Sequence, residues 1–255
     1  MTDNIMAGNI IVFLGPTLSV SKAQDILEAE YHPPAAQGDI YRAALRHPQA
    51  ILLIDGYFGD VPAVTHKEIL WALSQGIHVF GSSSMGALRA TELHSFGMVG
   101  VGEVFAAFRD GELEDDDEVA ISHGPAALNY PNLSESMVNI RWSLNLAKAE
   151  GIISRRSHDD LIALAKQQYY ADRSYVSLLR NAQESGFDHL ELKRLGAWLS
   201  DHKVDQKQQD AVALLKLLND AEKWPQLTSS IKFYFEHTLT WDQLRHEALK
   251  DRSKS

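Results

Sequence analysis

Short apolar runs and helix-like segments alternate along the first half of the chain. Nearly continuous apolar runs occupy residues 9–14, 50–54 and 78–81, and a glycine, an aspartate or a serine follows each of them. Runs of this length without polar alternation are typical of strands buried on both faces. Helical periodicity separates the runs, at residues 22–28, 39–47 and 65–75. This order of strands and helices predicts a parallel sheet covered by helices.

The pattern changes in the second half of the chain. Residues 97–124 are rich in turns, with a helix expected at 103–109 and a further strand at 119–123. Beyond Pro131 the periodicity is almost entirely helical. Helices are expected at residues 134–151, 158–170, 176–184, 189–200, 206–220 and 241–249. We therefore expect an α/β fold, with a parallel-sheet core domain over residues 1–130 and an all-helical C-terminal domain or cap over 131–255.

Composition and charge narrow the classes of function. The chain has 255 residues, no cysteine and a formal net charge of -10. The absence of cysteine excludes disulfides, a thiol nucleophile, thiolate metal sites and a persulfide carried on the protein. The negative charge disfavours nucleic-acid binding, because phosphate contacts need clustered lysine and arginine. We expect proteins or small molecules as partners.

Targeting signals are not evident in the sequence. No apolar run approaches the roughly 20 residues that a membrane-spanning helix needs. Residues 1–9 lack the basic start of a secretory signal. A cytoplasmic location without a membrane partner is therefore expected.

The junction at residues 78–92 is the most informative part of the sequence. An apolar strand pattern leads into Ser82, Ser83 and Ser84, and a good helix-forming run begins at Met85. The spacing around Ser84, small-x-Ser-x-Gly, is similar to the nucleophile elbow of serine hydrolases, although Ser82 stands in place of the first glycine. An alternative is a plain strand-to-helix turn, in which a serine caps the helix. Both interpretations stay open at this point.

The loops that follow the predicted strands are expected to meet, because ligands of parallel α/β sheets bind at the carboxyl ends of the strands. These loops are Gly15-Pro16-Thr17, residues 55–60, residues 82–84, and Ser122-His123-Gly124. Together they supply hydroxyls, carboxylates, an imidazole and glycines. Residues expected to contact a substrate are Gly15, Thr17, Tyr57, Ser83, Met85, Gly86, Arg89 and Glu92.

Catalytic roles can be assigned within this set. Ser84 is the expected nucleophile, and the oxyanion would be bound by the N–H of Met85 or Gly86 together with one from the Gly15 loop. His123 is the first choice as general base, with Asp55 or Asp60 as the carboxylate that orients it. A loop histidine facing solvent is the alternative for His123.

Charged residues near this junction allow two interpretations each. Arg89 either binds an anionic group of the substrate or pairs with Glu92 at the i,i+3 spacing. The acidic run Glu114–Glu118 either binds a divalent metal or forms a solvated face, and the second is expected because consecutive loop residues point in different directions. Familiar nucleotide-binding motifs are absent from the sequence. No metal and no cofactor is expected.

Several blocks of sequence resemble the TfuA-like core domain family over roughly residues 9–130. The blocks are Gly15–Leu18, Ile54–Phe58, His66–Leu70, Ser83–Leu93, Gly97–Gly102 and Arg109–Ala120. The resemblance implies an association with a YcaO-type cyclodehydratase or thioamide synthetase, which uses ATP to activate a peptide backbone amide. It also implies a ubiquitin-like sulfur-carrier protein as a second partner.

What the resemblance implies for activity is the sulfur-delivery half of backbone thioamidation. The chain would hydrolyse the C-terminal thiocarboxylate of the carrier and release sulfide beside the YcaO enzyme. Acyl chemistry of this kind agrees with the site expected at Ser84. The alternatives are a non-catalytic module that binds or activates YcaO, and an α/β protein that binds a small anionic ligand.

Overall fold

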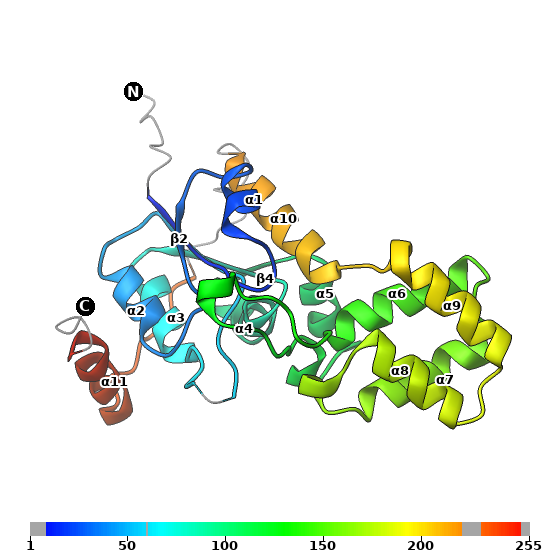
Figure 1. The fold of residues 1–255 in the computed structure, drawn as a ribbon. Helices are drawn as coiled ribbons and strands as arrows, with labels where there is room; N and C mark the ends of the chain where they lie inside the picture. Colours follow the sequence, from blue (N-terminus) through cyan, green and yellow to red (C-terminus); the bar gives the residue numbers. More distant parts are fainter. Residues whose placement is uncertain (1–8, 60, 221–230, 251–255) are drawn as a thin grey trace. The chain divides into compact units, whose positions relative to one another are not determined.

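The computed structural model describes residues 9–59, 61–220 and 231–250 (Figure 1). Asp60, one of the two expected orienting carboxylates, therefore lies outside the described residues. These residues form two compact units. The first unit lies within Met1–Glu112 and Gln208–Ser255, and the second is Leu113–Lys207. Their bounds differ from the expected segments 1–130 and 131–255, because apolar residues near the C-terminus pack in the core of the sheet.

A five-stranded parallel sheet forms the centre of the first unit, which confirms the predicted α/β class. Its strands are β1 (Ile10–Phe13), β2 (Glu30–His32), β3 (Ala50–Leu53), β4 (His78–Ser82) and β5 (Val99–Val101), in the order β2-β1-β3-β4-β5. The strand order reverses between β1 and β3, and ligands of open α/β sheets bind at such a reversal. The sequence pattern missed β2 and β5, because each has only three residues and neither is fully buried.

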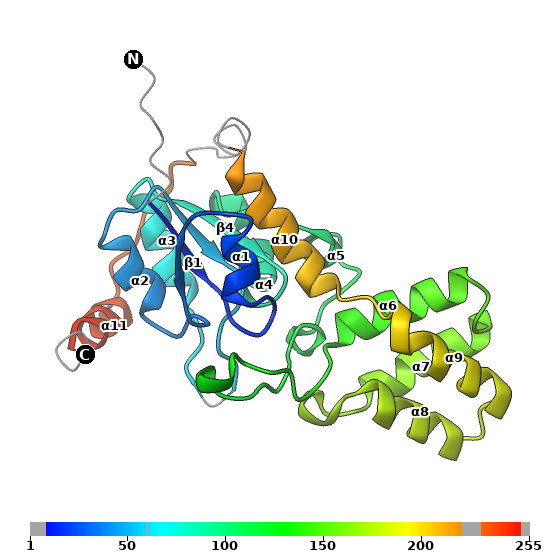
Figure 2. The ribbon, with the colours of Figure 1, turned by 45° about the horizontal axis from the view of Figure 1, so that its top comes forward.

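Seven α-helices of the described chain accompany this sheet. They are α1 (Val20–Gln24), α2 (Asp39–Ala44), α3 (His66–Ser74), α4 (Met85–Leu93), α5 (Glu103–Arg109), α10 (Gln206–Asn219) and α11 (Leu239–Lys250). Helices α1 and α10 lie side by side on one face of the sheet (Figures 1 and 2). Leu214 and Leu215 of α10 share a buried cluster there with Leu52 of β3. Helix α11 packs against α2, where the Trp241 and Tyr41 rings meet edge to face.

The strand predicted at residues 119–123 is wrong. The structure has a short 3-10 helix, η2 (Asp116–Glu118), and then irregular backbone. His123 forms an isolated antiparallel bridge with Asn132. Backbone acceptors of this segment find partners other than a strand, since Val119 O accepts from Lys207 Nζ and Ser122 O accepts from the N–H of Leu133.

The second unit is helical, as predicted for this part of the chain. Its α-helices are α6 (Met137–Ala149), α7 (Arg155–Lys166), α8 (Tyr175–Glu184) and α9 (His189–His202), with 3-10 turns η3 (Ala126–Leu128) and η4 (Tyr170–Asp172). Each of the four α-helices has a serine or aspartate at its N-cap whose side chain accepts a backbone N–H. Leu144, Leu161 and Leu195 belong to the core of the unit. Within the described ranges, no helix combines the length and apolarity needed to cross a membrane.

Candidate functional site

The turn between β4 and α4, which we call the serine turn (residues 82–84), has a strained backbone. Ser83 has a φ of 65°, and the Ser84 N–H donates a 2.8 Å hydrogen bond to Ser82 O. This i to i+2 bond closes a γ-turn around Ser83, and γ-turns with a positive central φ are rare. Strain of this kind clusters at functional sites. The strain lies at Ser83, one residue before the serine that the elbow-like spacing singles out.

Two glycines bring the start of α4 against the sheet. A Cβ added at Gly86 would lie 1.7 Å from Leu53 O, and one added at Gly81 would lie 2.1 Å from Gly86 O. The N–H of Gly86 donates to Ile54 O over 3.3 Å. No side chain larger than hydrogen fits at either position, so the N-terminus of α4 lies directly over the carboxyl ends of β3 and β4.

The Ser84 hydroxyl does not cap the helix. Ser84 occupies the N-cap position of α4, and its carbonyl accepts from the N–H of Ala87 and Leu88, but its side chain makes no capping hydrogen bond. Ser84 keeps 9% of its surface exposed, whereas Ser82 and Ser83 are fully buried. Among the described residues, Ser84 Oγ has no hydrogen-bond partner. The capping interpretation therefore does not account for this hydroxyl.

One backbone donor beside this hydroxyl is open as well. The first N–H groups of a helix lack partners within the helix. Gly86 N–H is already bound to Ile54 O, while in the described chain Met85 N–H makes no hydrogen bond. The Met85 side chain is buried and packs where a Cβ at Gly56 would clash with it. Met85 and Gly86 were the two expected sources of an oxyanion donor on α4, and of these only the Met85 N–H is unpaired in the described chain.

Asp55 links the loops after β1 and β3. Its Oδ2 accepts from the N–H of Gly15 at 2.9 Å and of Thr17 at 3.0 Å, and its Oδ1 accepts from the Thr17 hydroxyl at 2.6 Å. These bonds lie where the strand order reverses. The Gly15 N–H, which was expected as an oxyanion donor, is therefore bound to Asp55 instead. Tyr57 is half-buried next to this link, and its N–H donates to Ala35 O.

His123 belongs to the second unit, outside the sheet. Its Nδ1 lies 2.9 Å from Gly124 O, and its ring packs edge-on against Tyr130. Because a carbonyl only accepts, Nδ1 carries a proton and the neutral ring keeps its lone pair on Nε2. In the described part of the first unit, no histidine ring makes a hydrogen bond with Ser84 Oγ.

The Arg89 side chain makes hydrogen bonds to other residues of its own unit. Its Nε donates to Val64 O at 2.9 Å and its Nη1 to Glu92 Oε2 at 2.7 Å. Glu92 Oε2 also lies 2.8 Å from His66 Nε2. Of the two interpretations left open by the sequence, these contacts show the salt bridge with Glu92.

Part of the chain matches a known protein family. Residues 55–174 match the model of the TfuA-like protein family. This segment of the chain is TfuA-like. No curated protein matches it. The TfuA-like segment begins at Asp55 and contains the serine turn and His123. It also extends through α6 and α7, beyond the limit of 130 expected from the sequence, and it does not include the Gly15–Thr17 loop.

Three cations bind the acidic run of the TfuA-like segment: Arg141 of α6, Lys166 of α7, and Arg173 from the loop before α8. Arg141 donates two hydrogen bonds to Glu118, at 2.9 and 2.8 Å. Lys166 contacts Asp115, Asp117 and Glu118, and the fully buried Arg173 donates to Asp117 Oδ2 at 2.7 Å. The expected solvated face is thus wrong for Asp117 and Glu118, because these cations pair with them. The described residues hold no group of three or more metal-ligating side chains.

The sequence interpretation also missed Glu68, a fully buried carboxylate of the TfuA-like segment. It accepts from the N–H and hydroxyl of Thr65 and from the N–H of Gly38, so it holds the starts of α2 and α3 together. Burial raises the pKa of Glu68 to about 7, and the hydrogen bonds from Thr65 oppose that rise. The Thr65-x-x-Glu68 spacing is the capping-box signal that could have identified it.

Proposed function

We propose that this chain is an accessory protein of YcaO-dependent peptide-backbone thioamidation, in which it releases sulfide from a thiocarboxylated sulfur carrier. The TfuA-like match supports the pathway. The unpartnered Ser84 hydroxyl beside the open Met85 N–H supports the reaction. A cytoplasmic location is part of the same proposal, because the carrier and YcaO substrates would meet the chain there.

Ser84 acts as the nucleophile in this proposal. Its oxygen attacks the carbonyl carbon of the carrier's C-terminal thiocarboxylate, and the new C–O bond replaces the C–S bond. The sulfur leaves with the hydroxyl proton as hydrosulfide, and an ester remains on Ser84. Water then hydrolyses the ester to the carboxylate, returns a proton to Ser84 and releases a proton to solvent.

The backbone of α4 stabilises the charge that develops on the carbonyl oxygen. The N–H of Met85 points from the N-terminus of a nine-residue helix, where the helix dipole favours negative charge. Asp55 holds the neighbouring Gly15–Thr17 loop in place and takes no part in proton transfer. No step of this mechanism uses a metal or a bound cofactor.

Sulfide release from purified thiocarboxylated carrier tests the proposal. We expect release by the wild-type protein in the absence of YcaO and at least 100-fold slower release by Ser84→Ala. Release by Ser95→Ala, which changes an exposed serine of the 3-10 helix η1 (His94–Phe96), should be unchanged. Ser83→Ala tests whether the strained serine, and not Ser84, carries the reaction. We expect this variant to retain most of the activity. The role of His123 as general base stays a prediction, which His123→Ala tests in the same assay.

Two results would overturn parts of this proposal. Unchanged release by Ser84→Ala would exclude the serine nucleophile and favour attack by a bound water. No release by the wild-type protein, together with formation of a stable complex with a YcaO enzyme, would replace the hydrolase by a non-catalytic activating module.

A further inference from the structure

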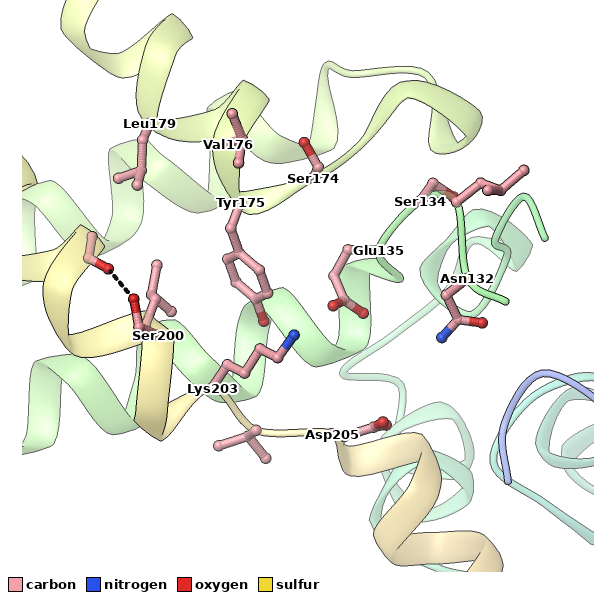
Figure 3. Close-up of a pocket in the computed structure, with 14 residues that line it drawn as sticks. Asn132, Ser134, Glu135, Ser174, Tyr175, Val176, Leu179, Ser200, Lys203 and Asp205 are labelled. Atoms are coloured by element: carbon pink, nitrogen blue, oxygen red, sulfur yellow. Dashed lines mark hydrogen bonds between the residues drawn. The ribbon is translucent and has the colours of Figure 1, made fainter. Parts of the chain in front are cut away.

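A cavity within the second unit is lined by none of the residues that the proposed reaction uses. Its volume of about 500 Å³ falls in the range of ligand-binding pockets. Four segments line it: residues 132–135 before α6, the start of α8, the end of α9, and residues 203–205 (Figure 3).

Asn139 holds two carboxylates together at this cavity. Its Oδ1 accepts the backbone N–H of Lys207 at 3.2 Å, which fixes the orientation of the amide because that N–H can only donate. The Nδ2 group then donates to Glu135 Oε1 at 2.9 Å and to Asp205 Oδ1 at 3.1 Å. Two negative charges from distant parts of the sequence therefore share one amide.

Glu135 keeps an acceptor open toward the cavity. Its Oε1 is bound by Asn139 and by the N–H of Ser136, but across the described ranges its Oε2 accepts no hydrogen bond. The carboxylate, the Tyr175 hydroxyl and the end of Lys203 point toward one another in Figure 3. Burial raises the pKa of Glu135; the Asn139 hydrogen bond opposes the rise and the charge of Asp205 adds to it.

Three charged side chains line the cavity: the carboxylates of Glu135 and Asp205 and the ammonium group of Lys203. A bound cation would remove the repulsion between the carboxylates and donate to Glu135 Oε2. Charge complementarity therefore selects a ligand with an ammonium or guanidinium group.

Aliphatic side chains surround this acidic centre. Leu133 and Val176 line the cavity while remaining 66% and 78% exposed, and Leu179 and Leu199 line it as well. The Tyr175 ring forms a fixed wall, because its hydroxyl is 2.7 Å from Ser143 Oγ and donates to Asn139 O at 3.2 Å. A ligand that covers Leu133 and Val176 as well as the carboxylates needs apolar groups on either side of its cation.

We propose that this cavity docks a peptide segment of a partner protein in which a lysine or arginine is flanked by aliphatic residues. The cationic side chain donates to Glu135 Oε2 between Asp205 and Tyr175, and its aliphatic neighbours cover Leu133 and Val176. The docking does not rest on the hydrolysis at Ser84, so either proposal can fail without the other.

Selection from a phage library of random heptapeptides on the intact protein tests this docking. We expect the selected peptides to carry lysine or arginine beside leucine, isoleucine or valine. Fluorescence anisotropy of these peptides, once synthesised with a label, should show at least tenfold weaker binding to Glu135→Gln and to Val176→Ser. The exposed Asp201→Asn serves as the matched control and should bind as the wild type does. Circular dichroism of each variant verifies that the unit is folded.

The other outcomes would overturn the proposal. They are the selection of no peptide, the selection of peptides without a basic residue, or equal binding to the wild type and to Glu135→Gln. Free L-arginine or L-lysine that raises the melting temperature of the wild type but not of Glu135→Gln, without any selected peptide, would reassign the cavity to a small molecule.

Discussion

The Thr17 hydroxyl donates a 2.6 Å hydrogen bond to Asp55 Oδ1, so a residue after β1 is bound to a residue after β3. Both residues are buried, and Asp55 Oδ2 also accepts the N–H groups of Gly15 and Thr17. This contact fixes the two loops at the point where the strand order reverses, beside the serine turn.

Asp55→Ala should destabilise the first unit strongly. The substitution leaves two backbone N–H groups without an acceptor, and an unpaired buried donor costs about 1–3 kcal/mol each. We expect a loss of about 3 kcal/mol in the free energy of unfolding, against about 1 kcal/mol for Thr17→Val, which loses one neutral donor. Hydrogen exchange of peptides that cover β1 and β3, measured in urea, checks both values. Equal stability of the two variants would contradict the conclusion that Asp55 accepts the backbone N–H groups of Gly15 and Thr17.

Gly86→Ala should displace α4 from the sheet. The new Cβ would overlap Leu53 O, a backbone atom of the central strand that cannot rotate away. Overpacking of this kind costs about 1–3 kcal/mol or more, and we expect the upper end because the clash is with backbone. Thr91→Ala in the same helix is the control and should change stability by less than about 1 kcal/mol. A melting temperature of Gly86→Ala equal to that of the control would show that the close approach is absent.

Arg173→Met should destabilise the second unit. Arg173 is fully buried and also donates to the carbonyls of Asp117, Ala165 and Gln168. Removal of one partner from a buried ion pair costs about 3–5 kcal/mol. Arg156→Met removes an arginine that is 93% exposed and pairs loosely with Asp160, so it should cost less than about 0.5 kcal/mol. Hydrogen exchange of α6 and α7 in urea distinguishes the two variants.

The same ion pairs predict a loss of stability in acid. Burial alone would raise the pKa of Asp117, but hydrogen bonds from Lys166 and Arg173 lower it below the usual 3.8. A carboxyl group with a lowered pKa in the folded state stabilises above its unfolded pKa and loses this contribution as the pH falls further. The stability difference between the wild type and Asp117→Asn should therefore shrink from pH 6 to pH 3. A constant difference would mean that Asp117 is not ionised in these pairs.

Glu68 predicts the opposite pH dependence for the first unit. Its pKa is raised from 4.5 to about 7 in the folded protein. The folded state thus binds a proton more tightly than the unfolded state, and stability falls as the pH rises from about 4.5 through 7. We expect up to about 3 kcal/mol less stability at pH 8 than at pH 5 from this group. Urea denaturation of Glu68→Gln at both pH values provides the comparison, and the same slope in this variant would exclude Glu68 as its source.

The fold class and the position of the serine turn follow from the sequence alone. Apolar runs such as residues 50–54 have the period and length of buried strands, and the amphipathic stripes after residue 131 have the period of helices. Local chemistry alone sets these features. For the same reason the sequence placed a strand end, three serines and a helix start next to one another, which the structure confirms.

Which groups stay unpaired and which find partners depends on how the elements pack together. Asp55 is occupied by Thr17, and the acidic run by Lys166 and Arg173, through contacts between distant parts of the sequence that local spacing does not specify. For Arg89 the i,i+3 spacing allowed the pair with Glu92 but left ligand binding as an alternative, and the fold shows the pair. The short strand β5 forms because its neighbour β4 supplies hydrogen bonds, and the strand predicted at 119–123 fails because other groups bind its carbonyls. Packing of Gly86 on Leu53 likewise leaves the Met85 N–H and the Ser84 hydroxyl unpaired. A hydrogen bond depends on where both partners lie in space, and the fold sets those positions.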